Sequence, residues 1–297
     1  MHSLIRNRDR LLAHGFTAGR EKAIDIVAHA LQGVNARQAV KNKVHRVDEV
    51  LKIEDQSFDL RNARHIYAIG SGKATFPLAA ALEDILGERI TDGFIAVKDG
   101  QSGQMNRIRV MEAAHPVPDH RSVAAGRQVL DVAKKAGPDD LVICLMSGGV
   151  SSLCCEPVAD ISFEDKMTTS RLMVNSGANI DEIMTVRGHL SQIKLGRLAH
   201  AIHPAVMISL TVSDAIGDPI KWNTDWTSPD SSRRADAVSI LKKYDLWDKA
   251  PEAVRQYLTK LEKNTDLRSD YTAYRIHNFM VVKTTELTEA AVRKAQD

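Results

Sequence analysis

Five short apolar segments, separated by stretches of helical periodicity, constrain the fold of this chain more than any other feature. They are rich in β-branched residues and bounded by Gly, Pro, Asp or Ser, which is typical of buried strands. The five predicted strands are His65–Ile69, Phe94–Val97, Ile108–Met111, Leu141–Met146 and Val206–Val212. Amphipathic helices are predicted between them, for example at Lys73–Leu86, Ser122–Lys135 and Asp181–Lys194. The alternation predicts βαβ units and a Rossmann-like, three-layer α/β/α fold with a mostly parallel sheet.

Both ends of the chain have helical periodicity. Residues 1–60 are predicted to form a helical segment that packs on a main α/β domain spanning residues 61–297. The part after Ser231 is expected to be helical and richer in charge, and it ends in a predicted helix at Glu286–Gln296. Ala290, Ala291 and Ala295 would give this last helix a closely packing face. A packing helix at the end of the chain leads us to expect a further domain beyond Asp297.

Composition narrows the possible partners and location. The 297 residues carry a formal net charge of +2, with 43% hydrophobic and 26% charged residues, which is typical of a soluble globular protein. A net charge this small argues against a general nucleic-acid or membrane-surface role. The three cysteines form no CxxC pair, the N-terminus has no signal-peptide core, and no apolar run reaches membrane-spanning length. We therefore expect a cytoplasmic protein and leave open whether it forms a homodimer.

A glycine turn with a lysine follows the first predicted strand. It consists of Gly70, Ser71, Gly72 and Lys73, and it opens the next helix. Such a turn directs backbone N–H groups toward an anion, and Lys73 adds a positive charge. Tyr67 and Ala74 occupy positions where a P-loop needs other residues, and the third glycine of a dinucleotide fingerprint is absent. An ordinary tight turn with a solvated lysine is an equally good interpretation.

A second Gly/Ser turn follows the strand Leu141–Met146, and ligands of open α/β sheets bind where strands end. Adjacent glycines let backbone amides approach oxyanions, and hydroxyl groups add hydrogen-bond donors. The candidate binding residues of this turn are Ser147, Gly148, Gly149, Ser151 and Ser152. A nucleophile elbow of the GxSxG type is absent. The alternative is a turn whose glycines serve only its conformation.

A basic stretch lies in the predicted helix Asp181–Lys194. Helical spacing would place Arg187, Ser191 and Lys194 on one face, and Arg197 would extend the patch. His189 belongs to the same candidate set. Two cations and a hydroxyl suit a carboxylate or a phosphate, which arginine can bind with two hydrogen bonds. A solvated basic helix face is the alternative.

An acidic turn follows the last predicted strand, at Ser213–Asp218. Asp214 and Asp218 are candidate Mg²⁺ ligands because magnesium takes oxygen donors together with phosphate oxygens. Either carboxylate is also a candidate acceptor for a substrate hydroxyl proton. Helix capping and turn formation, which aspartate favours, are the alternative roles.

These segments, in this order, resemble the glycerate 2-kinase family, whose members pair this domain with a C-terminal domain of the MOFRL type. The resemblance rests on GSGKA at Gly70–Ala74, AAHPVPD at Ala113–Asp119, LMSGGVSSL at Leu145–Leu153, the block Ser176–Ala199, and SDAIGD at Ser213–Asp218. It implies transfer of phosphate from ATP, with Mg²⁺, to D-glycerate or a closely related hydroxyacid, giving 2-phosphoglycerate. Lys73, Arg187 and Asp214 are the implied catalytic residues, and the MOFRL-type domain is expected to be absent from this chain.

The chain departs from the family pattern at three places. Val150 and Leu195 stand where the family usually has glycine, and Ile220–Asp230 carries Trp222 and Trp226 in place of a small-residue loop. Some relatives bear the name hydroxypyruvate reductase, an alternative activity that would require a dinucleotide fingerprint. A third possibility is a non-catalytic domain that binds an anionic metabolite.

Overall fold

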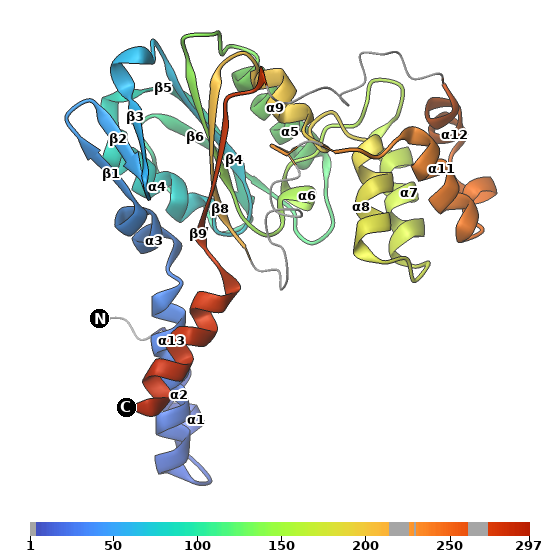
Figure 1. Cartoon of the computed structure of the whole chain (residues 1–297). Helices are drawn as coiled ribbons and strands as arrows, with labels where there is room; N and C mark the ends of the chain where they lie inside the picture. Colours follow the sequence, from blue (N-terminus) through green and yellow to red (C-terminus); the bar gives the residue numbers. More distant parts are fainter. Residues whose placement is uncertain (1–3, 214–225, 229, 261–272) are drawn as a thin grey trace.

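The computed structural model describes residues 4–213, 226–228, 230–260 and 273–297. Its centre is a parallel six-stranded sheet with the strand order β6-β5-β4-β7-β8-β9 (Figure 1). The strands are β4 (Ile66–Ser71), β5 (Ile90–Lys98), β6 (Ile108–Ala113), β7 (Leu141–Met146), β8 (Val206–Val212) and β9 (Ile276–Val282). All five predicted strands are confirmed. Strand β9 was missed because His277 and Asn278 interrupt its apolar run. The helical prediction for the part after Ser231 is therefore wrong at these residues.

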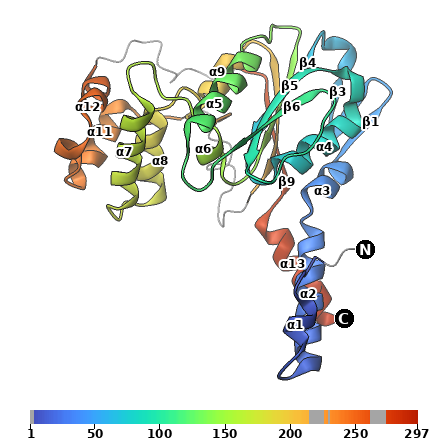
Figure 2. The ribbon, with the colours of Figure 1, turned by 180° about the vertical axis from the view of Figure 1, so that it is seen from behind.

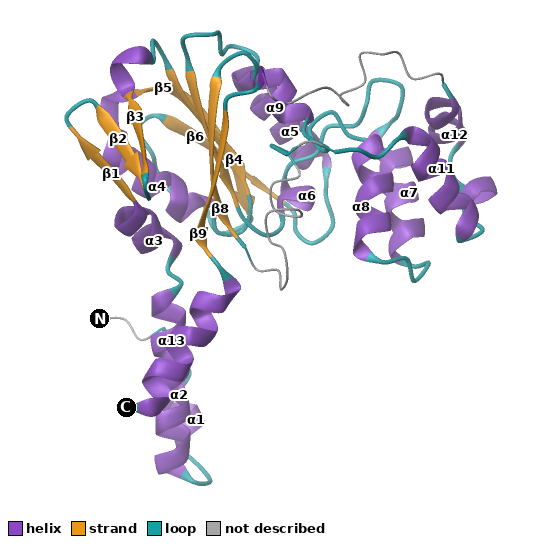
Figure 3. Ribbon diagram, in the orientation of Figure 1, coloured by secondary structure: helices purple, strands orange, loops and turns teal. Residues whose placement is uncertain are grey.

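Helices cover both faces of the sheet, which confirms the three-layer α/β/α architecture (Figure 3). Along β4, Ile66 and Ala68 point into a core shared with α3 (Ala36–Lys43) and α4 (Thr75–Leu86). The alternate residues Tyr67 and Ile69 point into a second core. That core is shared with α5 (His120–Ala133) and α9 (Arg197–Ile202). The sheet is thus buried on both sides, as its continuous apolar runs indicate.

The segment before Arg61 is only partly helical. It holds α1 (Arg8–Leu12), α2 (Thr17–Gly33) and α3, followed by an antiparallel sheet and a short 3-10 turn at Leu60–Asn62. The strands of that sheet are β1 (Val44–Val47), β2 (Val50–Ile53) and β3 (Gln56–Asp59). The helical prediction is therefore wrong for residues 44–59. The two hairpin turns take Asp48 and Glu54 at positive φ, without the glycine that usually signals such turns.

Helices α2 and α13 (Thr284–Gln296) lie side by side and extend away from the sheet (Figures 1 and 2). The helix predicted at the C-terminal end of the chain is confirmed. Ala290 is buried beside Gly33, whereas Ala295 is exposed, so only part of the predicted alanine face is covered. An ion pair between Lys43 and Glu286, 3.1 Å long, ties α13 to the end of α3.

Four further helices form a separate cluster beside the sheet (Figure 2). The helical cluster comprises α7 (Phe163–Val174), α8 (Ile180–His189), α11 (Arg234–Lys243) and α12 (Glu252–Thr259). It packs around its own apolar core, which includes Met173, Val186 and Leu241. A short helix, α6 (Val150–Leu153), lies between this cluster and the sheet (Figure 1). Across the described ranges, no helix is both long and apolar enough to cross a membrane.

Candidate functional site

The two Gly/Ser turns meet at the carboxyl ends of neighbouring strands. Strands β4 and β7 pair in parallel as far as Ser71 and Met146, so the turns that follow lie against each other. The Lys73 amide donates to the Gly148 carbonyl at 2.9 Å. The Ala74 amide donates to the Ser147 hydroxyl, also at 2.9 Å. The turns predicted separately from the sequence therefore form one structure.

Two glycines make this close approach possible. Gly72 has φ of +138°, and a Cβ atom placed there would lie 2.2 Å from Ser147 Oγ. Gly149 has φ of +97°, and its Cβ would lie 3.0 Å from the His115 ring and 3.2 Å from Lys73 Cγ. No larger residue fits either position without displacing its neighbours. The Lys73 side chain thus passes directly beside Gly149.

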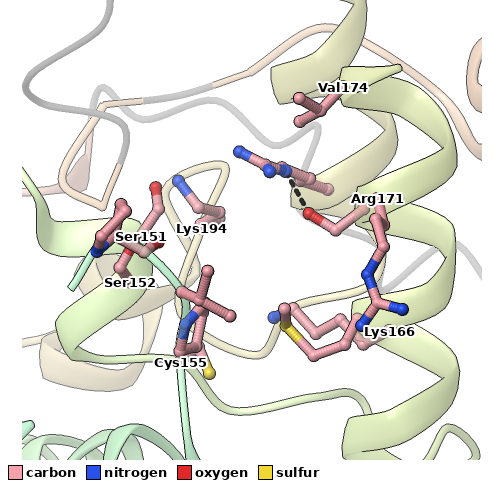
Figure 4. Close-up of a pocket in the computed structure, with 13 residues that line it drawn as sticks. Ser151, Ser152, Cys155, Lys166, Arg171, Val174 and Lys194 are labelled. Atoms are coloured by element: carbon pink, nitrogen blue, oxygen red, sulfur yellow. Dashed lines mark hydrogen bonds between the residues drawn. The ribbon is translucent and has the colours of Figure 1, made fainter. Parts of the chain in front are cut away.

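A cavity of about 340 Å³ opens beside this turn, toward the helical cluster (Figure 4). Its walls come from the segment 116–118, helix α6 and the Cys155 that follows it, helix α7, and two residues in and after α8. They are Pro116, Val117, Pro118, Ser151, Ser152, Cys155, Lys166, Met167, Ser170, Arg171, Val174, Arg187 and Lys194. Four of them are cations, three are serines, and none of these described wall residues is acidic. Such a lining suits an organic anion.

Arg187 reaches the cavity from the last turn of α8. A capping box holds the start of that helix: Asn179 accepts from the Glu182 amide, and Glu182 accepts from the Asn179 amide. The Arg187 guanidinium donates through Nε to Ser170 Oγ on α7 at 2.5 Å. Burial lowers the pKa of Arg187 from its ordinary value, because removal from water disfavours the charged form.

Lys166 lines the cavity from the opposite helix, α7, and sequence analysis missed it. Figure 4 shows it across the cavity from Ser151, Ser152 and Lys194. Its side chain belongs to a helical stripe, Lys166, Met167, Ser170, Arg171 and Val174, spaced i, i+1, i+4, i+5 and i+8. The stripe by itself does not identify Lys166 as a cavity residue. The sequence does not show which face of α7 turns toward a cavity, because the neighbouring segments decide it.

Three predicted binding residues of the basic stretch lie outside the wall of the cavity, near the turn after α8. Gly70–Lys73 and Ser147–Gly149 also lie outside this wall. His189 is buried and contacts Ser232 through Nε2 at 3.0 Å. Ser191 Oγ accepts from the Ile193 amide at 3.2 Å. Arg197 donates to the carbonyls of Gly188, at 2.8 Å, and Ser191.

The predicted helix Asp181–Lys194 is too long, since α8 ends at His189. Ser191 and Lys194 therefore do not share a helix face with Arg187. The irregular turn nevertheless returns Lys194 to the same cavity. Leu195 takes φ of +57° just before Gly196, at one of the positions where the resemblance led us to expect glycine. Val150, the other such position, is the first residue of helix α6.

The proposed metal ligands Asp214 and Asp218, together with Trp222, lie outside the described residues. Trp226 is described and is fully buried in the core shared by α5 and α9. Within the part of the chain that the structure describes, no group of three or more His, Cys, Asp or Glu residues could hold a metal ion. Cys155 lines the cavity, but burial raises the pKa of its thiol, which keeps it protonated and unreactive.

Comparison with known proteins shows what this arrangement is similar to. Residues 22–259 match the model of a family described as domain of unknown function DUF4147. The chain is 35% identical to a glycerate 2-kinase from Pyrococcus horikoshii, over 93% of the chain and 62% of that protein. It is 40% identical to a putative hydroxypyruvate reductase from Agrobacterium vitis, over 60% of the chain and 46% of that protein.

Among solved structures, the chain resembles a glycerate kinase from Thermotoga maritima with a TM-score of 0.78 and 29% identity. The match covers 94% of this chain and 62% of the Thermotoga chain. The chain therefore spans less than two thirds of the length of each of these three relatives.

Proposed function

The chain belongs to the DUF4147 domain family, and we propose that it is a kinase for D-glycerate or a closely related hydroxyacid. In the proposed reaction the terminal phosphate of ATP passes to the 2-hydroxyl group, giving 2-phosphoglycerate. The names of the Pyrococcus and Thermotoga relatives support this reaction. The structural observation that carries the proposal is the cationic cavity. Ser151 and Ser152 line it, and they directly follow the Gly/Ser turn that contacts Lys73.

Phosphoryl transfer depends on positioning and on stabilising negative charge rather than on covalent chemistry of the protein. Arg187 and Lys194 would hold the carboxylate of the acid or a phosphate, and the Ser151 hydroxyl would contribute a hydrogen bond. Lys73 would stabilise the charge that develops on the transferred phosphoryl group. Ser152 has a supporting role, since its hydroxyl donates to the Pro116 carbonyl at 2.7 Å and holds one wall of the cavity.

ATP and Mg²⁺ enter the proposal through the family resemblance. Asp214 and Asp218 are the proposed ligands of the metal, which would neutralise phosphate oxygens when bound. The MOFRL-type C-terminal domain and a cytoplasmic location are also proposed. The greater length of the relatives supports the first, and three free, buried cysteines support the second.

The test is an assay that couples ADP release to a spectroscopic signal, run on the purified chain and on any longer form its gene encodes. D-glycerate, L-glycerate and hydroxypyruvate are compared as acceptors, and ³¹P NMR distinguishes 2- from 3-phosphoglycerate. We expect D-glycerate-dependent ADP release with 2-phosphoglycerate as the product. Absence of ADP release with every acceptor in both forms contradicts the kinase and favours a binding-only domain.

A reductase acting on hydroxypyruvate is a second candidate because the Agrobacterium relative bears that name. The turn at Gly70–Lys73 argues against it, since it lacks the third glycine with which dinucleotide-binding turns pack helix against strand. The check is loss of NADH or NADPH absorbance when hydroxypyruvate is added without ATP. A steady loss of absorbance would favour the reductase.

A further inference from the structure

Lys166 places a primary amine in the cavity that has no hydrogen-bond partner within the described residues. The residue is only 7% exposed, so water offers little compensation. A buried charge without a partner is costly, and proteins usually pair it or keep it neutral. Helix α7 holds the residue firmly, because Ser162 caps the helix start by accepting from the Asp165 amide.

The groups around Lys166 do not supply the missing partner. The thiols of Cys155 and Cys154 adjoin it, and burial raises the pKa of both, so they stay neutral. Glu156 attracts the amine from a distance, but one of its carboxylate oxygens already contacts Arg127 at 3.2 Å. Lys194 repels it. The remaining charges on the cavity wall, Arg171 and Arg187, are also cations.

We infer that Lys166 is a substrate-binding residue whose amine binds the carboxylate of the hydroxyacid in this cavity. The ligand would supply the hydrogen-bonded anionic partner that the described protein groups around Lys166 do not. The identity of the acid as D-glycerate rests on the proposed function. The need for an anion at Lys166 does not rest on the proposed function, because it follows from the cavity itself.

The rest of the wall favours a short organic acid over a nucleoside triphosphate. Pro116, Val117, Pro118, Met167 and Val174 give the cavity an apolar side that suits carbon atoms. Serine hydroxyls supply hydrogen bonds for hydroxyl groups of the ligand. The described wall offers no carboxylate for a metal ion that would accompany a nucleotide. A small acid with one carboxylate and one or two hydroxyls fits this combination.

Ligand binding should couple to a proton at Lys166. Burial lowers the pKa of this amine from 10.5 to about 8 in the unliganded protein. A bound carboxylate favours the charged amine and raises its pKa again. Above about pH 8 the protein must therefore take up a proton as the acid binds, and affinity must fall as the pH rises further.

Isothermal titration calorimetry with D-glycerate, in the absence of ATP, tests this inference. Titrations at pH 8.5 in two buffers of different ionisation enthalpy measure the protons taken up. We expect uptake of a fraction of a proton by the parent chain. In Lys166→Met, which keeps the length of the side chain, affinity should fall roughly 10- to 100-fold, the effect of losing a charged hydrogen bond. The variant should also take up fewer protons.

Lys52→Met is the matched control, because Lys52 is an exposed residue of β2, away from the cavity wall. It should bind D-glycerate with the affinity and proton uptake of the parent. Lys166→Arg, which keeps a charge at all working pH values, should bind D-glycerate without the pH dependence. Thermal unfolding of each variant shows that loss of binding is not loss of the fold.

Three outcomes would overturn the inference. The first is equal affinity and proton uptake in the parent and Lys166→Met, and the second is no binding of D-glycerate by the parent. The third is binding of inorganic phosphate, but not of D-glycerate, that depends on Lys166. The kinase proposal fails separately: Lys166-dependent binding without ADP release would contradict the kinase and leave the inference intact.

Discussion

Lys73 lies where the turns after β4 and β7 meet, and its backbone is held by the Gly148 carbonyl. Its side chain passes beside Gly149 of the Gly/Ser turn that follows β7. A lysine supported in this way can deliver a positive charge to a bound phosphate while the backbone stays in place. The family resemblance also implies a catalytic role for Lys73.

Because Lys73 is the proposed charge stabiliser, Lys73→Ala should lower the rate of D-glycerate phosphorylation roughly 10²- to 10⁵-fold. The physical reason is the loss of the charge that stabilises the transferred phosphoryl group. The measurement is ADP release at saturating D-glycerate and ATP, with Lys52→Ala as a control that should keep the parent rate. Near-normal turnover in Lys73→Ala would remove Lys73 from the mechanism.

Lys166 should also make the free energy of unfolding depend on pH. Its pKa is about 8 in the folded chain and near 10.5 when unfolded, so below pH 8 both states carry the charge and the cost of burying it is fully present. Between pH 8 and 10.5 the folded state binds fewer protons than the unfolded state. The free energy of unfolding must therefore rise with pH in this window, by about 3 kcal/mol at most.

Lys166→Met should consequently be more stable than the parent at pH 7, and its advantage should shrink as the pH rises from 8 toward 10.5. Urea denaturation at a series of pH values measures both free energies of unfolding. The Lys52→Met control should show no such convergence. An advantage that stays constant across the whole range would mean that the amine is not titrating as the structure indicates.

At the scale of elements, α8 decides where Arg187 points. The helix begins at the capping box of Asn179 and Glu182, and Glu182 is also bound by Lys243 at 2.6 Å and by the Tyr244 hydroxyl at 2.6 Å. Its other end stops at His189, and the positive φ values of Leu195 and Gly196 turn the chain further along, before α9. Both ends of α8 are therefore held by local chemistry, and Arg187 lies between them.

Removing the cap should loosen this element. We expect Asn179→Ala to lower the free energy of unfolding by about 1 kcal/mol, because the Glu182 amide loses its acceptor. Thermal or urea unfolding gives the value. Asn179→Ser keeps an accepting oxygen and should stay within a few tenths of a kcal/mol of the parent. Equal losses in both variants would show that the cap does not stabilise α8.

At the scale of the whole molecule, the cavity joins two bodies with separate cores. One wall comes from the sheet side, through Ser151, Ser152 and the segment 116–118, and the other comes from α7 and α8 of the helical cluster. A ligand that contacts both walls must restrain them relative to each other. The pair α2 and α13 extends on its own, away from the sheet (Figure 1).

Hydrogen exchange should report this restraint. With saturating D-glycerate, amides of α7, α8 and the segment 116–118 should exchange more slowly, because the bound ligand disfavours local opening. Amides of α2 and α13 should be unaffected and serve as the internal control. Protection confined to α2 and α13, or absent everywhere, would place the ligand elsewhere.

The sequence by itself determined five of the six strands of the sheet and the turns that follow β4 and β7. Buried parallel strands need continuous apolar runs, and such runs are visible without any tertiary information. The turns were also visible in the sequence through Gly72 and Gly149. Only glycine tolerates both the positive φ and the close contact at these two positions. The hairpins of residues 44–59 were not, since Asp48 and Glu54 take positive φ in place of glycine.

Tertiary structure alone decided the rest of the candidate site. Lys166 is 21 residues from Arg187 along the chain, and nothing in the spacing of α7 shows which of its faces meets α8. Lys194 reaches the cavity through an irregular turn rather than along a helix face. The Arg197 side chain holds this turn by donating to the carbonyls of Gly188 and Ser191. Periodicity predicts which elements form. Which side chains share a cavity depends on how those elements pack, because contacts between elements carry no local signal in the sequence.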